Sequence, residues 1–343
     1  MLNSVKFCNF VFFKKLMERI LKDSRVLVTG GAGFIGSNLV ESLLHSGNSV
    51  VVLDNFSTGK RENLIPFMDN PKFKLIEGDI RNYADCLKAV ENIDIVFHEA
   101  ALGSVPRSIK DPITSTDVNI GGFVKMLFAA KESGVKRFIY AASSSTYGDH
   151  PDLPKVEDKI GSPLSPYAIT KYVDELFADN FAKTYGIEVI GLRYFNVFGR
   201  HQDPDGAYAA VIPKFMKMLM KHEVPHINGD GSVSRDFTYI DNVIQANHLA
   251  SIVQNKAALN QVYNVAFGER TSLNQLFYFI RDLAGSFDKS ILNIEPVYGL
   301  VREGDIPHSL ASIEKAKKLL YYSPAFNVED GLKEAVKWYW ENL

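Results

Sequence analysis

Residues 25–36 read RVLVTGGAGFIG and give the clearest indication of the fold. An apolar run ends at a glycine turn, and an amphipathic segment follows it as far as His45. Gly30, Gly33 and Gly36 allow a tight turn and a close approach of the backbone to a pyrophosphate, and the N-terminus of the following helix favours an anion. A strand, a glycine turn and a helix in this order predict the first unit of a dinucleotide-binding domain.

Apolar segments and helical patterns alternate along the chain after this unit. The predicted strands cover residues 25–30, 49–54, 73–78, 93–100, 137–143 and 188–195, and the clearest predicted helices cover 114–133 and 166–185. Such alternation is typical of a parallel sheet with crossover helices. We therefore expect an α/β fold, with a Rossmann-type doubly wound parallel sheet over 25–199 to which residues 241–266 return. Residues 200–240 and 267–343 are expected to form a smaller C-terminal α/β lobe that binds the substrate.

Charge and cysteine content exclude several classes of partner. The formal net charge of −2 leaves no basic excess for nucleic acid or an anionic membrane, so a small metabolite is the expected ligand. Cys8 and Cys86 are far apart, and neither has a second Cys or a His at metal-ligand spacing. We therefore expect no metal site, no disulfide and a cytoplasmic location.

Residues 1–24 precede the first predicted strand and are interpreted as an N-terminal extension. The apolar run over 10–13 is too short for a signal peptide, and a membrane span needs about 20 apolar residues. We expect either a surface helix or a start codon placed upstream of the true start at Met17.

Asp54 ends the second predicted strand and selects the cofactor. A carboxylate at this position can accept hydrogen bonds from the adenosine ribose and would repel a 2′-phosphate, so NAD is expected rather than NADP. Lys60 and Arg61 could instead favour NADP, because their positive charges could bind a 2′-phosphate. We interpret these two residues as the solvent-exposed start of a helix.

Residues 162–171 read SPLSPYAITK and carry the predicted chemistry. The proline starts a helix with Ser165 as its cap, so Tyr167 lies in the first turn and Lys171 one turn later on the same face. A phenol with an ordinary pKa of about 10 is a poor base, whereas a lysine ammonium, a helix dipole and a cationic nicotinamide ring all favour the phenolate. Three serines at 143–145 end the fifth predicted strand and can donate to a substrate oxygen.

Together, TGGAGFIG, Asp54, the three serines and YAITK resemble the extended short-chain dehydrogenase/reductase family from about residue 25 to the C-terminus. Longer strings are similar to the UDP-N-acetylglucosamine 4-epimerases of bacterial surface-polysaccharide pathways, such as O-antigen synthesis. These strings are ALGSVPRS (101–108), SSSTYGDHP (143–151), LRYFNVFGR (192–200), GAYAAVIPKF (206–215), INGDGSVSRDF (227–237) and REGDIPHSLA (302–311). The resemblance implies an NAD-dependent UDP-sugar 4-epimerase and a homodimer joined by the helices near 114–133 and 166–185.

The resemblance also implies roles for individual residues. Tyr167 would be the base, Ser143 would hold the sugar O4, and Lys171 would bind the nicotinamide ribose. The expected cofactor-binding residues are Gly30, Gly33, Phe34, Ile35, Gly36, Asp54, Asn55, Ser57, Thr58, Gly59, Asp79, Ile80, Ala100, Ala101, Asn119, Tyr167, Lys171 and Tyr194. The expected substrate-binding residues are Gly103, Ser104, Arg107, Ser143, Ser144, Asn196, Ala210, Val211, Asn228, Arg235, Arg302, Asp305 and Ser309.

Within that substrate set, three positions carry specific expectations. Arg235 and Arg302 would hold the diphosphate and Asp305 the uridine ribose. Because Ser309 is small where strict glucose/galactose enzymes tend to carry a tyrosine, N-acetylated sugars should fit.

Several alternatives stay open at this point. Ser144 and Ser145 occupy the positions where a 4,6-dehydratase or a decarboxylase needs acidic residues, which disfavours elimination. A net reductase would use the same tyrosine and lysine, and a non-catalytic dinucleotide sensor would need neither. Arg107 could serve a C6 carboxylate, so a 4-epimerase of UDP-N-acetylglucosaminuronic acid is the main alternative. Glu99 departs from the neutral residue expected there and would have to turn away from the pyrophosphate.

Overall fold

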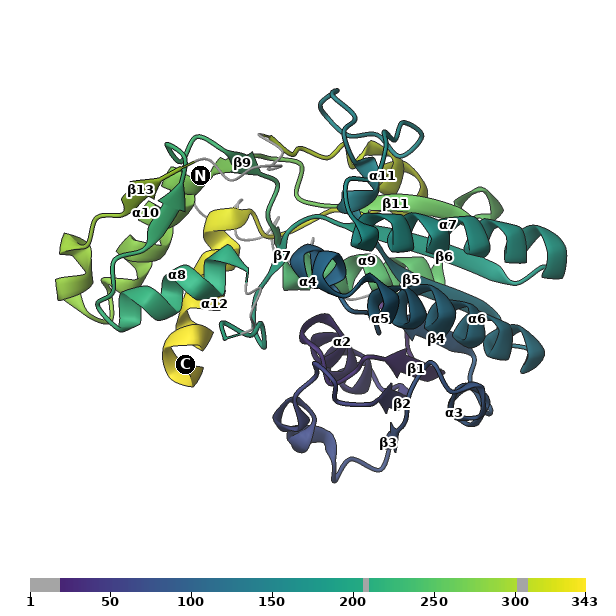
Figure 1. Cartoon of the computed structure of the whole chain (residues 1–343). Coiled ribbons are helices and arrows are strands. Elements are labelled where there is room, and N and C mark those ends of the chain that lie inside the picture. Colours follow the sequence, from purple (N-terminus) through teal and green to yellow (C-terminus); the bar gives the residue numbers. More distant parts are fainter. Residues whose placement is uncertain (1–18, 206–209, 301–307) are drawn as a thin grey trace, which may run out of the picture.

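A seven-stranded sheet forms the centre of the molecule in the computed structural model, which describes residues 19–205, 210–300 and 308–343 (Figure 1). The strand order is β11-β6-β5-β4-β1-β2-β3, and every neighbouring pair is parallel. The strands are β1 (Arg25–Thr29), β2 (Ser49–Asp54), β3 (Phe73–Glu77), β4 (Ile95–His98), β5 (Arg137–Ser143), β6 (Glu188–Tyr194) and β11 (Gln261–Val265). The predicted Rossmann-type fold is therefore confirmed, and β11 joins the six strands predicted before residue 200.

Helices cover both faces of this sheet. The helices around it are α2 (Phe34–His45), α3 (Tyr83–Ala89), α4 (Val105–Lys110), α5 (Pro112–Thr116), α6 (Phe123–Glu132), α7 (Pro166–Tyr185), α9 (Ile240–Ile252) and α11 (Glu314–Leu320). One hydrophobic cluster joins Val26 and Val28 of β1 to α2 and α9, and a second joins Leu27 to α3, α6 and α7. Alternate residues of β1 thus face two buried layers, which explains why the strand reads as a continuous apolar run.

The helix predicted over 114–133 is built from three segments instead of one. A π-helical turn, η3 (Asp117–Gly122), separates α5 from α6. At Gly122 a Cβ atom would lie 2.5 Å from Cδ1 of Ile80, so the turn packs directly against the segment that follows β3. The wider turn brings Asn119 into the buried interior, as π-bulges often do near functional sites.

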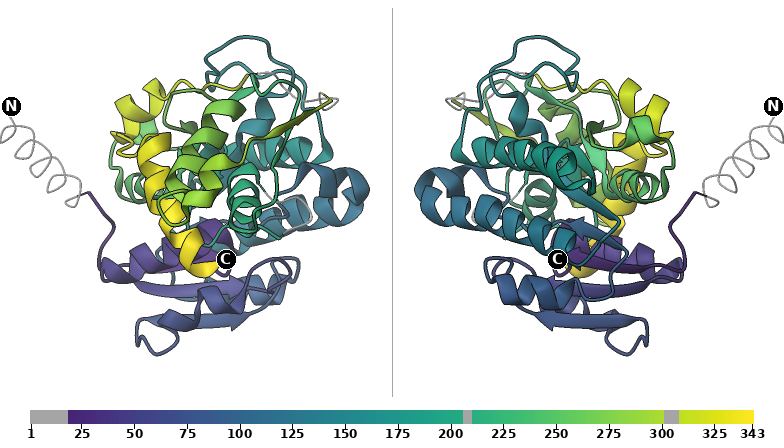
Figure 2. Two further views of the ribbon diagram at one scale, coloured as in Figure 1. Left: turned by 90° about the vertical axis from the view of Figure 1, so that its left-hand side faces the viewer. Right: turned by 90° about the vertical axis from the view of Figure 1, so that its right-hand side faces the viewer.

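Short strands and three helices form the remaining part of the chain, seen at the left of Figure 1. The helices α8 (Val211–Met220), α10 (Leu273–Ala284) and α12 (Val328–Asn342) pack against one another. The short strand pairs are β7 (Val197–Phe198) with β10 (Thr238–Tyr239), β8 (His226–Asn228) with β13 (Val297–Gly299), and β9 (Ser234–Arg235) with β12 (Thr271–Ser272). Both views of Figure 2 show these green and yellow elements on the opposite side of the molecule from β2 and β3.

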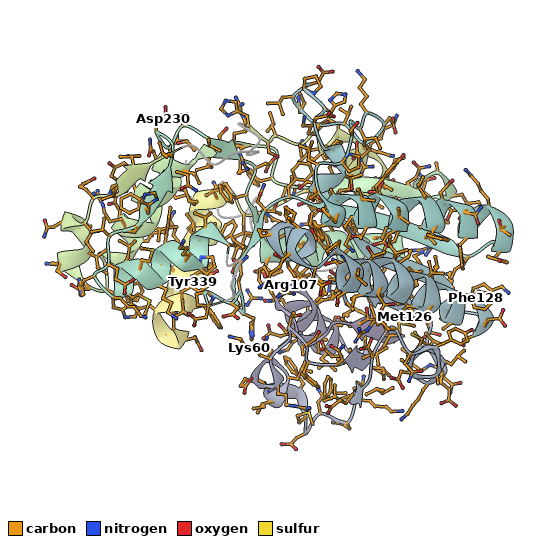
Figure 3. The ribbon with its side chains drawn as sticks, in the orientation of Figure 1. Lys60, Arg107, Met126, Phe128, Asp230 and Tyr339 are labelled. Atoms are coloured by element: carbon orange, nitrogen blue, oxygen red, sulfur yellow. The ribbon has the colours of Figure 1, made fainter. Side chains whose placement is uncertain are left out.

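Two contacts tie the chain ends to this framework. The Tyr339 hydroxyl of α12, labelled in Figure 3, donates to the Gly199 carbonyl at 3.0 Å. Near the other end, Leu21 is buried, and its N–H donates to Nδ1 of His248 on α9 at 3.2 Å. The expected surface helix lies largely in residues 1–18, outside the described residues, and none of the described helices is long and apolar enough to cross a membrane.

A buried ion pair fixes α7 against the sheet. Nε and Nη2 of Arg193 on β6 donate to the two carboxylate oxygens of Glu175 at 2.8 and 2.7 Å. Both side chains are less than one-tenth exposed, at 4% and 7%. The two parallel hydrogen bonds satisfy the charges that burial would otherwise penalise, and so hold α7 at one position along β6.

We predict that Glu175→Gln lowers the free energy of unfolding by roughly 3 kcal/mol, because it leaves the Arg193 guanidinium buried without a carboxylate. Urea unfolding of both proteins measures this difference. The control is Asp179→Asn, which breaks the exposed Lys183–Asp179 pair on the same helix and should cost less than about 1 kcal/mol. Equal losses in the two variants would contradict the prediction.

Candidate active site

The glycine turn after β1 leaves no room for side chains. Gly30 has a φ of 68°, and a Cβ there would lie 2.8 Å from Cα of Ala100 at the end of β4. A Cβ at Gly36 would lie 2.1 Å from the Gly30 carbonyl oxygen. The turn is therefore closed to any other residue at these two positions, and it sets the first turn of α2, with its unpaired N–H groups, at the edge of the sheet.

A cavity of about 520 Å³ opens beside this turn, at the carboxyl ends of the strands. It is lined by every expected cofactor-binding residue except Asn119, and by Gly103, Ser143, Ser144 and Asn196 of the expected substrate set. Residues that the sequence did not single out also line it, among them Leu102, Val118 and Gln202. The size of the cavity and the glycine cradle at a helix N-terminus fit a dinucleotide.

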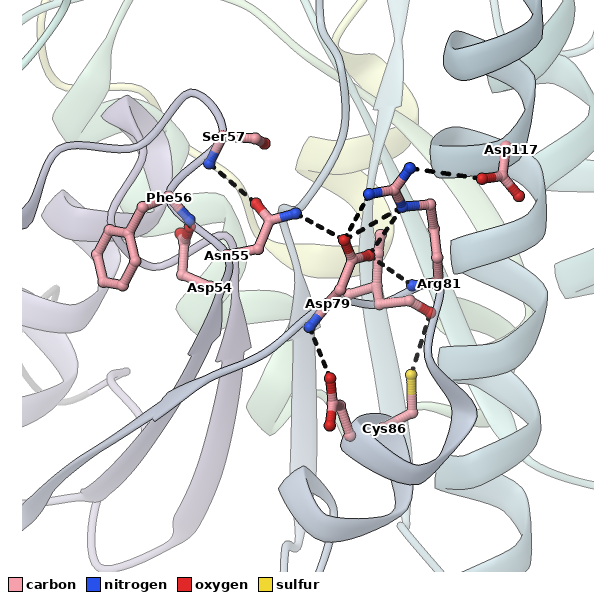
Figure 4. A network of polar contacts seen from close by, with 10 residues as sticks. Asp54, Asn55, Phe56, Ser57, Asp79, Arg81, Cys86 and Asp117 are labelled. Carbon is pink, nitrogen blue, oxygen red and sulfur yellow. Dashed lines mark hydrogen bonds and ion pairs between the residues drawn. The ribbon is translucent and has the colours of Figure 1, made fainter.

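Acidic residues at the ends of β2 and β3 organise one wall of this cavity (Figure 4). The Asp54 carboxylate accepts hydrogen bonds from the backbone N–H of Ala32, at 2.9 Å, and of Phe56, at 2.8 Å. It therefore braces the glycine turn, and each oxygen keeps a second lone pair for a ligand. Burial raises the pKa of Asp54, while these two hydrogen bonds oppose the rise.

Asp79 is held by its neighbours in the same wall. Its carboxylate accepts from Nδ2 of Asn55 at 2.8 Å and from Nη2 of Arg81 at 2.7 Å. The hydrogen bond from Arg81 is the main reason why the pKa of Asp79 is lowered to about 2. Arg81 in turn reaches Asp117 of η3 at 3.6 Å, which links β3 to the π-helical turn.

Tyr167 is positioned by hydrogen bonds at the start of α7. Ser165 caps the helix, as predicted, by accepting from the Ala168 N–H at 3.1 Å. The Tyr167 N–H, which no residue of its own helix can satisfy, donates to Oγ of buried Ser108 on α4 at 3.0 Å. Ser108 thus ties the tyrosine to the helix that carries Arg107, and no sequence pattern indicated this contact.

Lys171 lies one turn further along α7 and is 3% exposed. Its ammonium donates to the Ala141 carbonyl of β5 at 3.0 Å and to Oδ2 of Asp174 at 3.2 Å. Burial lowers the pKa of Lys171, whereas Asp174, Tyr167 and Glu99 raise it. The net shift of this pKa is upward. The lysine is therefore held as a cation at the wall of the cavity.

Ser143 ends β5 and is oriented by the next turn. Its Oγ accepts from the N–H of Ser145 at 3.2 Å and from the Ser145 hydroxyl at 2.9 Å. Because both contacts use Ser143 as an acceptor, its own proton is left to donate toward the cavity. Ser145 acts here as an orienting group and does not line the cavity itself.

Glu99 turns its carboxylate into the protein. Oε1 accepts from the Tyr194 hydroxyl at 2.9 Å, and that hydroxyl also accepts from Nδ2 of Asn247 at 2.9 Å. Oε2 is buried without a hydrogen-bond partner among the described residues. The residue as a whole is only partly buried because its other atoms line the cavity, but burial of the carboxylate raises the pKa of Glu99 to about 7.

We predict that Glu99→Gln stabilises the protein above pH 7. The pKa of Glu99 rises from 4.5 to about 7 on folding, so the folded state binds the proton more tightly and wild-type stability falls as pH rises through this window. The neutral amide avoids that loss, which is worth roughly 3.4 kcal/mol at most. Urea unfolding at both ends of the window tests this, and a gain equal at both ends would contradict it.

Asn119 is buried and joins three segments instead of lining the cavity. Its Oδ1 accepts from the Leu102 N–H at 2.8 Å, and its Nδ2 donates to the Thr170 hydroxyl at 3.0 Å. Thr170 directly precedes Lys171. Asn119 therefore holds the loop after β4 against α7, and its expected contact with the cofactor side stays a prediction.

A buried aspartate, Asp236, connects the loops that contain the expected substrate residues Arg235 and Ser309. The Asp236 carboxylate accepts from the N–H groups of Phe267, Gly268 and Ala311 at 3.1–3.3 Å. The Ser309 N–H donates to the Ser234 carbonyl at 3.1 Å, which places Ser309 beside Arg235. Nδ2 of Asn196 donates to the Asp236 carbonyl at 2.9 Å, so the same segment reaches the cavity.

The other expected substrate residues lie outside the lining of the cavity. Ser104 caps α4, Arg107 lies on α4 near the centre of Figure 3, Ala210 and Val211 start α8, and Asn228 ends β8. The guanidinium of Arg107 has no hydrogen bond or ion pair with the described residues. Arg302 and Asp305 lie outside the described residues.

Known proteins resemble this chain along nearly its whole length. The model of the NAD dependent epimerase/dehydratase family matches residues 26–266. UDP-glucose 4-epimerase of Mycolicibacterium smegmatis is 35% identical over 318 residues, covering 92% of this chain and 98% of that protein. UDP-N-acetylglucosamine 4-epimerase from Methanobrevibacter ruminantium, solved with UDP-N-acetylmuramic acid, is 39% identical with a TM-score of 0.87, covering 94% and 100%. UDP-glucuronic acid 4-epimerase from Bacillus cereus, solved with NAD and a fluorinated UDP-sugar, is 32% identical with a TM-score of 0.82, covering 92% and 99%.

The chain belongs to the NAD-dependent epimerase/dehydratase family. Within that family it is a UDP-sugar 4-epimerase with NAD as its cofactor. The predicted family, enzyme class and cofactor are confirmed.

Proposed function

We propose that this enzyme interconverts UDP-N-acetylglucosamine and UDP-N-acetylgalactosamine by reversible oxidation at C4, with UDP-glucose and UDP-galactose as a second pair to test. The observation that carries the proposal is the convergence of Ser143, Tyr167 and Lys171 on one cavity beside the glycine turn. The absence of acidic residues at 144 and 145 supports epimerisation over elimination. A sensor without catalysis could dispense with Tyr167 and Lys171, yet both are present.

The proposed mechanism assigns one task to each side chain. NAD, when bound, supplies a reversible hydride acceptor for C4 of the sugar. Tyr167 removes the proton from the 4-hydroxyl and returns it after the sugar has turned over, and Ser143 donates to O4 throughout. Lys171 stabilises the phenolate with its fixed positive charge. Arg235 and Arg302 hold the diphosphate and Asp305 the uridine ribose, so binding energy remote from C4 retains the intermediate.

We predict that Tyr167→Phe lowers kcat by roughly 10²–10⁴-fold, the usual contribution of a general acid–base, while the protein still binds NAD. Product formation by NMR and the nucleotide content of the purified protein measure the two effects. Tyr172→Phe, on the next turn of α7, is the matched control and should keep full activity. Wild-type turnover by Tyr167→Phe would refute the assignment.

Ser309 supports the choice of an N-acetylated sugar, because it is small and lies beside Arg235. We predict that Ser309→Tyr lowers kcat/KM for UDP-N-acetylglucosamine by at least about tenfold, and lowers it far less for UDP-glucose, since a bulky ring removes space next to the sugar. Initial rates of epimerisation, followed by NMR for each UDP-sugar offered separately, give both values. A parallel loss for both sugars would show that the position does not select the substrate.

One observation favours a second candidate substrate, UDP-N-acetylglucosaminuronic acid. The guanidinium of Arg107 makes no hydrogen bond or ion pair with the described residues and is available for bidentate binding of a C6 carboxylate. The same NMR comparison includes this sugar. A preference for the uronic acid that Arg107→Lys removes would assign the enzyme to that substrate.

We also propose that the enzyme is a cytoplasmic homodimer that supplies surface-polysaccharide synthesis. The helices α4, α5 and α7 contact one another and expose large apolar side chains, namely Ile109, Ile113, Ile169, Leu176 and Phe177 at 36–81% exposure. An apolar surface of this kind, on adjacent helices, is typical of a subunit interface.

We predict that Leu176→Arg yields a monomer, because it places a charge within that apolar surface. Sedimentation gives the mass. Val224→Arg, at a similarly exposed apolar position outside those helices, is the control and should leave the mass unchanged. A wild-type mass equal to one chain would refute the dimer itself.

A further inference from the structure

The carboxylate of Asp174 lies next to Lys171 and has no role in the mechanism proposed above. Asp174 is three residues beyond Lys171 on α7, and its Oδ2 lies 3.2 Å from the lysine Nζ. The aspartate side chain is fully buried at 0% exposure and that of the lysine is 4% exposed. An i,i+3 pair on a helix surface is ordinary, but a pair this deeply buried is not screened by water.

The other charges near the pair do not explain Asp174. Glu175, the next residue, uses both carboxylate oxygens to bind Arg193. Asp174 Oδ1 has no hydrogen-bond partner among the described residues. Among the described residues, the Asp174 side chain therefore forms a hydrogen bond with Lys171 alone. Its Oδ1 is buried without a hydrogen bond to offset the cost of desolvation.

The titratable and charged groups around the pair come from α7 and from the strands beneath it. They are Tyr167 and Glu175 on α7, Tyr140 on β5, and His98 and Glu99 at the end of β4. Burial raises the pKa of Asp174 to about 7, while Lys171 opposes the rise. When it is ionised, the Asp174 carboxylate offsets part of the positive field that Lys171 exerts on Tyr167.

We propose that Asp174 is a positioning residue that holds the Lys171 ammonium against β5 and sets the pH at which Tyr167 becomes a phenolate. This inference rests on the proposed roles of Tyr167 and Lys171. The hydrogen bond to Oδ2 and the one to the Ala141 carbonyl fix two of the three ammonium protons and direct the third toward the cavity. The carboxylate charge weakens the stabilisation of the phenolate by the lysine, so the base forms at higher pH than it would beside a neutral residue.

The test is Asp174→Asn, which keeps an acceptor for Lys171 and removes the charge. We expect the acid limb of the kcat/KM profile to move to lower pH by about 0.5–1 unit, with kcat on the plateau changed less than about threefold. The tyrosinate absorbance of the same protein, taken as the difference from its Tyr167→Phe counterpart, should shift by the same amount. This second readout needs no turnover, so it can fail while the proposed function holds, and the loss of activity in Tyr167→Phe tests that function separately.

The control is Asp330→Asn, which removes the carboxylate of an exposed i,i+3 pair with Lys333 on α12 and should move neither profile. If the asparagine variant does not fold, Asp174→Ala should move the acid limb in the same direction, with a lower kcat because the ammonium loses an acceptor. An acid limb and an absorbance midpoint that stay in place, or move to higher pH, would overturn the proposal.

Discussion

The backbone contact between the β1–α2 turn and the end of β4 is the constraint around which the site is built. Gly36 leaves space for the Gly30 carbonyl, and Gly30 leaves space for the backbone at Ala100, so two loops from distant parts of the chain meet without side chains between them. This close packing opens the cavity at the carboxyl ends of the strands and aims the N-terminus of α2 into it. Asp54 secures the arrangement by accepting from the backbone of the same turn.

The site also depends on charged side chains that are buried between α7 and the sheet. The sheet and α7 bury Arg193 with Glu175 as a fully hydrogen-bonded pair, which stabilises one position of the helix. Asp174 and Glu99 are also buried, but each has one carboxylate oxygen without a hydrogen-bond partner in the described part of the chain. Such groups cost stability and persist where they serve a function, and both lie close enough to Lys171 to act on its charge.

The helix α7 contributes both to the cavity and to the buried ion pairs. Its first turn presents Tyr167, its second presents Lys171, and its outer face exposes Leu176 and Phe177. Ser108 holds the start of the helix through a single hydrogen bond to the backbone of the tyrosine. The proposed chemistry, the anchoring of the helix and the proposed subunit contact therefore share one helix of 20 residues.

The fold, the cofactor turn and the helix with Tyr167 and Lys171 could all be predicted from the amino-acid sequence. These features are local: a glycine turn, an alternation of apolar runs and a Ser-Pro cap each act within a few residues. The sequence did not reveal the π-helical turn that buries Asn119, the hydrogen bond from Tyr167 to Ser108, or the three N–H groups that converge on Asp236. These features depend on tertiary packing, because each includes a hydrogen bond between a polar side chain and the backbone of a distant segment, and backbone groups are the same at every position. The Lys171–Asp174 pair is partly predictable from the sequence, because the spacing of three residues can be read there. The burial that strengthens this ion pair comes from the packing of α7 on the sheet.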